Sequence, residues 1–225
     1  MIYLVFTEGF SRSTGGAHIR DDLTAEAIRL ARLLYRLLPG SAEAAGLLGL
    51  LLLTEARRPA RTSGTGRPIP LAEQDRSRWT QALIAEGISL TQTAAASPGA
   101  GSYAIQAAIA AIHAESASFA DTDWAQIEKL YRMLQVYEPG PVVRLGHAVA
   151  WSQAHGLEAG LKRLDELADD PVLSQFRPFH VTRAITLTEL EKHEQAAAAY
   201  RRALALGGND AEDTFLLETL AALER

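Results

Sequence analysis

The sequence has no cysteine, which excludes disulfide bonds and thiolate metal sites and suits a cytosolic protein. It also lacks a long apolar run. Its most apolar stretch, GLLGLLLL at residues 46–53, has eight residues, far short of the roughly 20 that cross a bilayer. Residues 1–10 carry no basic leader or cleavage signal, so we expect neither a signal peptide nor a membrane anchor.

An excess of positive charge is missing as well. The formal net charge is −5 and the isoelectric point is about 5.7. Because phosphate backbones require a dense cationic face, we expect no direct nucleic-acid binding by this chain. With 225 residues, 48% of them apolar, the chain is long enough to bury a substantial core as one large or two small domains.

Helical periodicity dominates the first hundred residues. It predicts a short helix at residues 1–10, a flexible connector at 11–16, and a helix from the capping residues Asp21 and Asp22 to about Leu38. Pro39 and Gly40 end this helix, and Ser41 caps the next, which carries the apolar run to about residue 56. We expect this run to be buried on all sides.

A basic loop and a long helix follow. Residues 57–70, RRPARTSGTGRPIP, hold three prolines and two glycines, which exclude regular structure. From about Asp75 the pattern predicts a helix that runs through Trp79 toward residue 96. Residues 97–102, SPGAGS, then break the chain, and we place a domain boundary there, between residues 1–98 and residues 99–225.

The second half repeats a two-helix pattern. Positions 148, 160, 164 and 167 recur 36 residues later at 184, 196, 200 and 203, close to the roughly 34-residue period of tetratricopeptide repeats. A looser copy pairs a helix at 103–115 with a second helix that Asp123 and Gln126 cap as a capping box. Asn209 or Asp210 caps a final helix to about Leu223.

These patterns together predict an all-α fold. An N-terminal helical bundle continues into a right-handed solenoid of three tetratricopeptide-like helix pairs, which the last helix closes. Each pair needs stacked neighbours to bury its apolar face. We therefore expect the two parts to pack as one unit.

A charged and aromatic group lies at the end of the basic loop. Arg57 and Arg58 precede Asp75, Arg76 and Trp79, a mixture typical of interaction hot spots. The alternative is a helix start capped by Asp75 with Trp79 simply buried.

A second group poses the same choice between an interaction surface and ordinary packing. Gln106 and His113 lie on the predicted helix at 103–115, and Asp123 and Trp124 follow it. No nucleophile elbow, phosphate-binding loop or metal-ligand spacing is present. We expect a non-catalytic protein without metal or cofactor, in which these nine residues are the candidate interaction surface.

Six segments, in order along the chain, carry a resemblance to a known family. They are YLVFTEGF at 3–10, LLLTEARRPAR at 51–61, EQDRSRWTQALIAEG at 73–87, YAIQAAIAAIHAE at 103–115, DTDW at 121–124 and PVVRLGHAVA at 141–150. The chain resembles the C-terminal extension of a group of extracytoplasmic-function (ECF) sigma factors of bacterial RNA polymerase. It departs from that group at Thr7, where asparagine is usual, and at Gly146 and His147, where Asn-Arg is usual.

This resemblance implies a tetratricopeptide-like (TPR-like) regulatory domain that modulates transcription initiation in the cytoplasm. Its partners are expected to be the two sigma domains, which in that group precede the extension, RNA polymerase, or a regulatory protein. A helical domain that senses a small molecule and controls the same sigma factor is the alternative.

Overall fold

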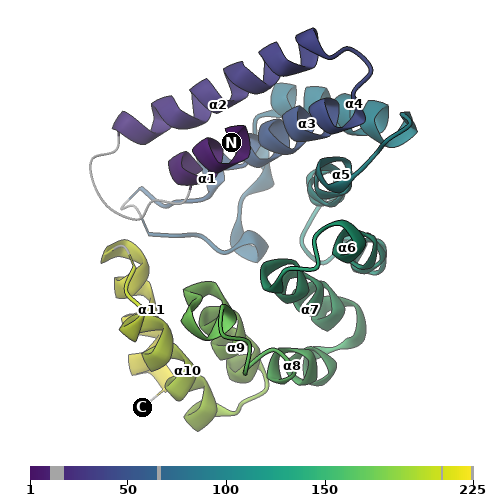
Figure 1. Cartoon of the computed structure of the whole chain (residues 1–225). Helices are drawn as coiled ribbons and strands as arrows, with labels where there is room; N and C mark the ends of the chain where they lie inside the picture. The colour runs from purple at the N-terminus through teal and green to yellow at the C-terminus, as the bar shows by residue number, and fades with distance from the viewer. Residues whose placement is uncertain (11–17, 65–66, 209, 224–225) are drawn as a thin grey trace. The chain divides into compact units, whose positions relative to one another are not determined.

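A computed structural model describes residues 1–10, 18–64, 67–208 and 210–223. Within these ranges the regular elements are helices, apart from one isolated bridge between Thr62 and Pro68, so the predicted all-α class is confirmed. The described residues form two compact units, Met1–Asp123 and Trp124–Arg225, each treated separately below (Figure 1). The predicted connector at 11–16 and the predicted cap Asn209 lie outside the described residues.

The N-terminal unit contains five α-helices and three short 3₁₀ turns among its described residues. In chain order these are α1 (Ile2–Phe10), α2 (His18–Leu37), α3 (Ala42–Ala56), η1 (Arg58–Ala60), η2 (Leu71–Glu73), η3 (Arg76–Arg78), α4 (Gln81–Ala96) and α5 (Ser102–Glu115). The predicted helices at 1–10, 41–56 and 103–115 are thereby confirmed to within a residue or two.

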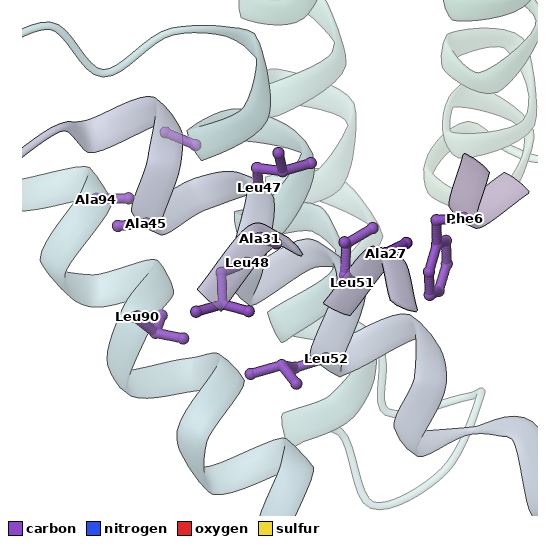
Figure 2. Packing of buried hydrophobic residues seen from close by; sticks show 11 residues of the cluster. Phe6, Ala27, Ala31, Ala45, Leu47, Leu48, Leu51, Leu52, Leu90 and Ala94 are labelled. Atoms are coloured by element: carbon purple, nitrogen blue, oxygen red, sulfur yellow. The ribbon is translucent and has the colours of Figure 1, made fainter. Parts of the chain in front are cut away.

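Helix α3 is the centre of this unit. It packs against α2, α4 and α5, and every residue of its apolar run from Gly46 to Leu53 is buried. Side chains from α1, α2 and α4 surround it, among them Phe6, Ala27 and Leu90 (Figure 2). The predicted burial on all sides is confirmed.

The carboxylate of Glu43 fixes the start of α5 against α3. It accepts hydrogen bonds from the backbone N–H groups of Gly101, Tyr103 and Ala104 at 3.0–3.1 Å. These are among the N–H groups that the first turn of a helix leaves without an intrahelical acceptor, and a negative charge there is favourable. Glu43 therefore positions the helix that carries Gln106 and His113.

Two predicted helix starts are wrong. Helix α2 begins at His18, so Asp21 and Asp22 lie inside it and do not cap it. The helix predicted from Asp75 begins only at Gln81. There, the Asp75 carboxylate accepts from the backbone N–H of Ser77 and closes the single turn η3, and Trp79 then adopts an extended conformation.

The described residues of the C-terminal unit form six α-helices and one 3₁₀ turn. These are α6 (Trp124–Tyr137), α7 (Pro141–His155), α8 (Leu157–Asp165), η4 (Leu173–Gln175), α9 (Arg177–Glu189), α10 (His193–Ala205) and α11 (Asp210–Leu223). Each α-helix packs against the next one along the chain. The predicted final helix is confirmed.

The 36-residue offset corresponds to equivalent buried positions. Ala148 and Leu164, on α7 and α8, are buried, as are Ala184 and Tyr200 on α9 and α10. The small residues Gly160 and Ala196 are also buried where the helices of each pair meet. Two helix pairs therefore share one packing pattern, whereas the solenoid geometry stays a prediction.

The two helices of the first predicted pair, at 103–115 and after Asp123, belong to different compact units. Helix α5 packs against α3 and α4, in the N-terminal unit, and α6 packs against α7, in the C-terminal unit. Along the chain, the first unit ends at Asp123 and the second begins at Trp124, whereas the predicted boundary at residue 98 falls in the loop between α4 and α5.

Among the described residues, no helix combines the length and the apolar character that a membrane span requires.

A substitution at Gly160 tests the close approach of α7 and α8. A Cβ atom there would lie 2.2 Å from the Cβ and 2.9 Å from the Cα of Ser152. We expect Gly160→Ala to lower the free energy of unfolding by about 1–2 kcal/mol, because the clash outweighs the better helix propensity of alanine. Urea denaturation measures this change.

Gly140→Ala is the matched control. A Cβ at Gly140 meets nothing within 4 Å, and its φ of −63° suits alanine. Its stability should change by less than about 0.5 kcal/mol. Equal effects of the two substitutions would contradict the close approach.

Candidate functional site

Three segments that are distant in sequence meet at one end of α3 in the N-terminal unit. Arg57 ends α3, η3 and Trp79 precede α4, and His113 lies in the last turn of α5. The backbone N–H of Thr80 donates to the carbonyl of Ala56 at 2.9 Å, which fixes Trp79 beside the end of α3. We call Arg57, Arg76, Trp79 and His113 the Trp79 cluster.

Trp79 is the buried member of this cluster. Its side chain is only 3% exposed and packs with Leu53, Ala56, Ile84 and Ala111 from α3, α4 and α5. The sequence left open whether Trp79 is a core residue or an interaction residue, and the structure places it in the core. Its ring nevertheless contacts charged groups.

Two guanidinium groups lie over the indole of Trp79. The central carbon of Arg57 is 5.5 Å from the ring centroid and that of Arg76 is 4.6 Å away. Both distances are within the range of cation–π attraction, which favours arginine over an aromatic face. Trp79 thus holds two positive charges close together.

Arg76 also binds the end of α5. Its Nη1 donates to the carbonyl oxygens of His113 and, at 2.9 Å, Ser116. The last carbonyl groups of a helix lack intrahelical donors and carry partial negative charge, so a cation there is favourable. This contact connects η3 to α5.

Burial and, to a smaller extent, neighbouring positive charges lower two pKa values in the cluster. Burial, together with the charges of Arg61 and Arg76, lowers the pKa of Arg57 to about 10. Burial and the charges of Arg57 and Arg76 lower the pKa of His113 to about 4. At neutral pH Arg57 is therefore charged, whereas His113 is neutral.

The cluster leaves hydrogen-bond donors unsatisfied. The Nε of Arg57, the Nη2 of Arg76 and the Nε1 of Trp79 are buried and have no acceptor among the described residues. Each unsatisfied buried donor costs about 1–3 kcal/mol. Natural structures have few such groups, and each calls for an explanation such as strain, an ordered water or a bound partner.

Two of the predicted site residues have other roles. Arg58 forms an ion pair with Glu55 and a hydrogen bond to Thr24, so it connects α2 with α3. Asp75 is exposed and caps η3.

The second predicted group is divided between the two compact units. Gln106 lies two turns before His113 on the same half-buried face of α5. Asp123 is exposed and is the last residue of the N-terminal unit, and Trp124 is the first residue of α6 in the C-terminal unit.

Sequence reasoning missed a polar network in the C-terminal unit. His147 on α7 bonds Glu128 through Nε2 at 3.1 Å and Gln135 through Nδ1 at 2.7 Å. Burial opposes the charge of Glu128, but the bond from His147 and the charge of Arg132 keep its pKa below the ordinary value. The signal in the sequence was Glu128, which follows Ile127, a core position of the predicted helix.

A cavity of about 300 Å³ lies next to this network. Its lining includes His147, Trp151, Arg144 and Arg163, and the guanidinium carbon of Arg163 is 4.6 Å from the centroid of Trp151. Arg144 forms an ion pair with Asp170. This second polar and aromatic site is built from α6, α7 and α8.

Two comparisons relate the chain to known proteins. Residues 1–95 match a family of unknown function, DUF6596. The chain is also 41% identical over 225 residues to an uncharacterized protein of Rhizobium meliloti (strain 1021), an alignment that covers 99% of this chain and 53% of that protein. The chain thus spans about half the length of this curated relative. The family match includes Arg57, Arg76 and Trp79.

The lowered pKa of His113 predicts a pH dependence of stability. The unfolded chain binds a proton at His113 near pH 6.5, whereas the folded chain binds it only near pH 4. Stability is therefore complete above pH 6.5 and is lost as the pH falls toward 4. We expect a loss of about 2–3 kcal/mol from this residue, allowing for partial solvent exposure.

Denaturation of the wild type and of His113→Gln between pH 4 and 7 measures this contribution. The substitution should remove it and so flatten that part of the profile. His193→Gln, which changes an exposed histidine on α10, should leave the profile unchanged. Parallel profiles for the wild type and His113→Gln would contradict the assignment.

Proposed function

We propose that this chain is a non-catalytic regulatory domain of an ECF sigma factor. It acts by docking to the sigma domains, to RNA polymerase or to a regulatory protein, and the Trp79 cluster is its principal contact. The observation that carries the proposal is the convergence of three separate segments of the sigma-factor resemblance on this cluster.

Each of these segments contributes a residue to one place. LLLTEARRPAR at 51–61 supplies Arg57, EQDRSRWTQALIAEG at 73–87 supplies Arg76 and Trp79, and YAIQAAIAAIHAE at 103–115 supplies His113. Core packing alone does not require two arginines over a buried tryptophan, because apolar neighbours fill such a space at lower cost. The arrangement is better explained by recognition of a partner.

The chemistry of the cluster suits a protein interface. Tryptophan and arginine are the side chains most often found at interaction hot spots. The cluster is also locally positive, whereas the chain as a whole carries a net charge of −5. Such a contrast orients the chain toward an acidic surface and speeds encounter more than it adds affinity.

The length of the relative also supports a regulatory domain. The Rhizobium meliloti protein continues well beyond the part that this chain matches, which leaves room in that protein for further domains. A domain that modulates an attached neighbour needs only weak contacts, since the linkage raises their effective concentration.

A second candidate is a small-molecule sensor within the same sigma factor. The cavity beside His147 and Trp151 favours it, because about 300 Å³ is the lower end of the range for ligand pockets. The polar network of Glu128 and Gln135 would fix the orientation of a ligand there.

A transcription assay with RNA polymerase tests the principal proposal. Initiation by the full-length protein is compared with initiation by a version that lacks these 225 residues. We expect the two activities to differ severalfold. Equal activity would refute a regulatory role.

Point variants of the full-length protein locate the contact. Arg57→Gln should reproduce most of the effect of the deletion, because loss of a hot-spot arginine weakens docking about 30-fold. Arg78→Gln removes an exposed arginine from the adjacent η3 and should behave as the wild type. Wild-type activity of Arg57→Gln would exclude the Trp79 cluster as the docking contact.

A further inference from the structure

We infer that the Trp79 cluster is an oxyanion-binding site, in which N–H groups of Arg57, Arg76 and Trp79 donate to a carboxylate or a phosphate. The inference deepens the proposed function by naming the chemical group that this surface recognises. It rests on the proposed function only for its biological role, since binding can be measured in the chain alone.

The first argument is the set of unsatisfied donors. Arg57 Nε, Arg76 Nη2 and Trp79 Nε1 come from three side chains, and each is buried without an acceptor among the described residues. Trp79 is only 3% exposed, and its indole nitrogen can donate but not accept a hydrogen bond. In the proposed site, the acceptor oxygens of the ligand satisfy these donors.

The second argument is uncompensated charge. Arg57 forms no ion pair with a described residue, and the charges that act on it, from Arg61 and Arg76, are both positive. Asp121 is the acidic group that acts on Arg76, and it is exposed. A bound anion relieves this repulsion, whereas a cation or a neutral apolar ligand does not.

The third argument is geometry. The two guanidinium groups lie over the indole ring, whose N–H projects in the ring plane at its edge. An oxyanion at this edge has two or more oxygens in the spacing that suits forked donors. Arg57 and Arg76 are both partly exposed, so a ligand can approach these two side chains from solvent.

Carboxylate and phosphate share this chemistry but come from different sources. An acidic side chain of a partner protein supplies the first, and a free anion supplies the second. Isothermal titration of the 225-residue chain with a short polyglutamate peptide and, separately, with inorganic phosphate distinguishes them. Sodium chloride holds the ionic strength constant, because screening alone weakens partly exposed charges.

We expect at least one of the two probes to bind with a dissociation constant of about 1 mM or lower. At about 10 mM it should then raise the melting temperature by about 3–5 °C. Binding of the peptide alone identifies a protein carboxylate as the ligand, and binding of phosphate alone identifies a free anion. Either outcome supports the site.

Two variants and one control assign the binding to the Trp79 cluster. Arg57→Gln should weaken binding about tenfold to a hundredfold. Trp79→Phe keeps an aromatic face for the arginines but removes the N–H, and it should weaken binding about tenfold. Arg78→Gln removes the same charge from an exposed neighbour and should change affinity less than twofold, roughly a surface charge effect.

Binding of neither probe overturns the inference, as does equal weakening by Arg57→Gln and Arg78→Gln. These failures are distinct from failure of the regulatory proposal. A chain that binds no oxyanion can still change transcription when it is deleted, and a chain that binds one can be without effect on transcription.

Discussion

The N-terminal unit depends on backbone contact between α3 and its neighbours. A Cβ atom at Gly46 would lie 2.6 Å from the backbone nitrogen of Ala104 on α5, and one at Gly49 would lie 3.1 Å from the carbonyl oxygen of Gly87 on α4. Helices that approach this closely cannot slide or rotate without losing contact along their length. The direction in which α3 ends is therefore fixed, and with it the position of Arg57.

The close packing around α3 allows the Trp79 cluster to persist, although the cluster is unfavourable by itself. Two neighbouring positive charges and several unsatisfied donors each destabilise the folded chain by an amount that is large against a total stability of about 5–15 kcal/mol. Leu53, Ala56 and Ile84 hold Trp79 in place through apolar burial, while Arg76 gains the carbonyl groups at the end of α5. The stability of the core thus offsets the cost of the cluster.

Features encoded by local pattern could be predicted from the sequence. The apolar run at 46–53 predicted a helix buried on all sides, and the 36-residue offset predicted equivalent packing of Gly160 and Ala196, because both depend on spacing within or between helices. The start of α4 could not be predicted in this way. Asp75 can cap a single 3₁₀ turn as well as a long helix. The hydrogen bond from the backbone N–H of Thr80 to the carbonyl of Ala56 is a contact between distant segments, and it holds the chain in the first of these two arrangements.

The candidate site was predicted in composition but not in arrangement. Arg57 and Arg58 are adjacent in sequence and chemically equivalent, yet Arg58 pairs with Glu55 and Thr24 whereas Arg57 faces Trp79. The link between Glu128 and His147 likewise depends on how α6 and α7 cross. Such choices are set by tertiary contacts between distant segments, which no single-sequence periodicity contains.

The difference between Arg57 and Arg58 also bears on the proposed oxyanion site. Arg58 has a carboxylate partner within the chain, so its charge is already neutralised locally. Arg57 is desolvated, its charge is opposed by Arg61 and Arg76, and the indole of Trp79 attracts it less strongly than a carboxylate would. A residue kept in this state gains more free energy from an incoming anion than one already paired, because binding does not first have to break an existing ion pair. In the proposed oxyanion site, recognition therefore depends on the charge of Arg57, which forms no ion pair with a described residue.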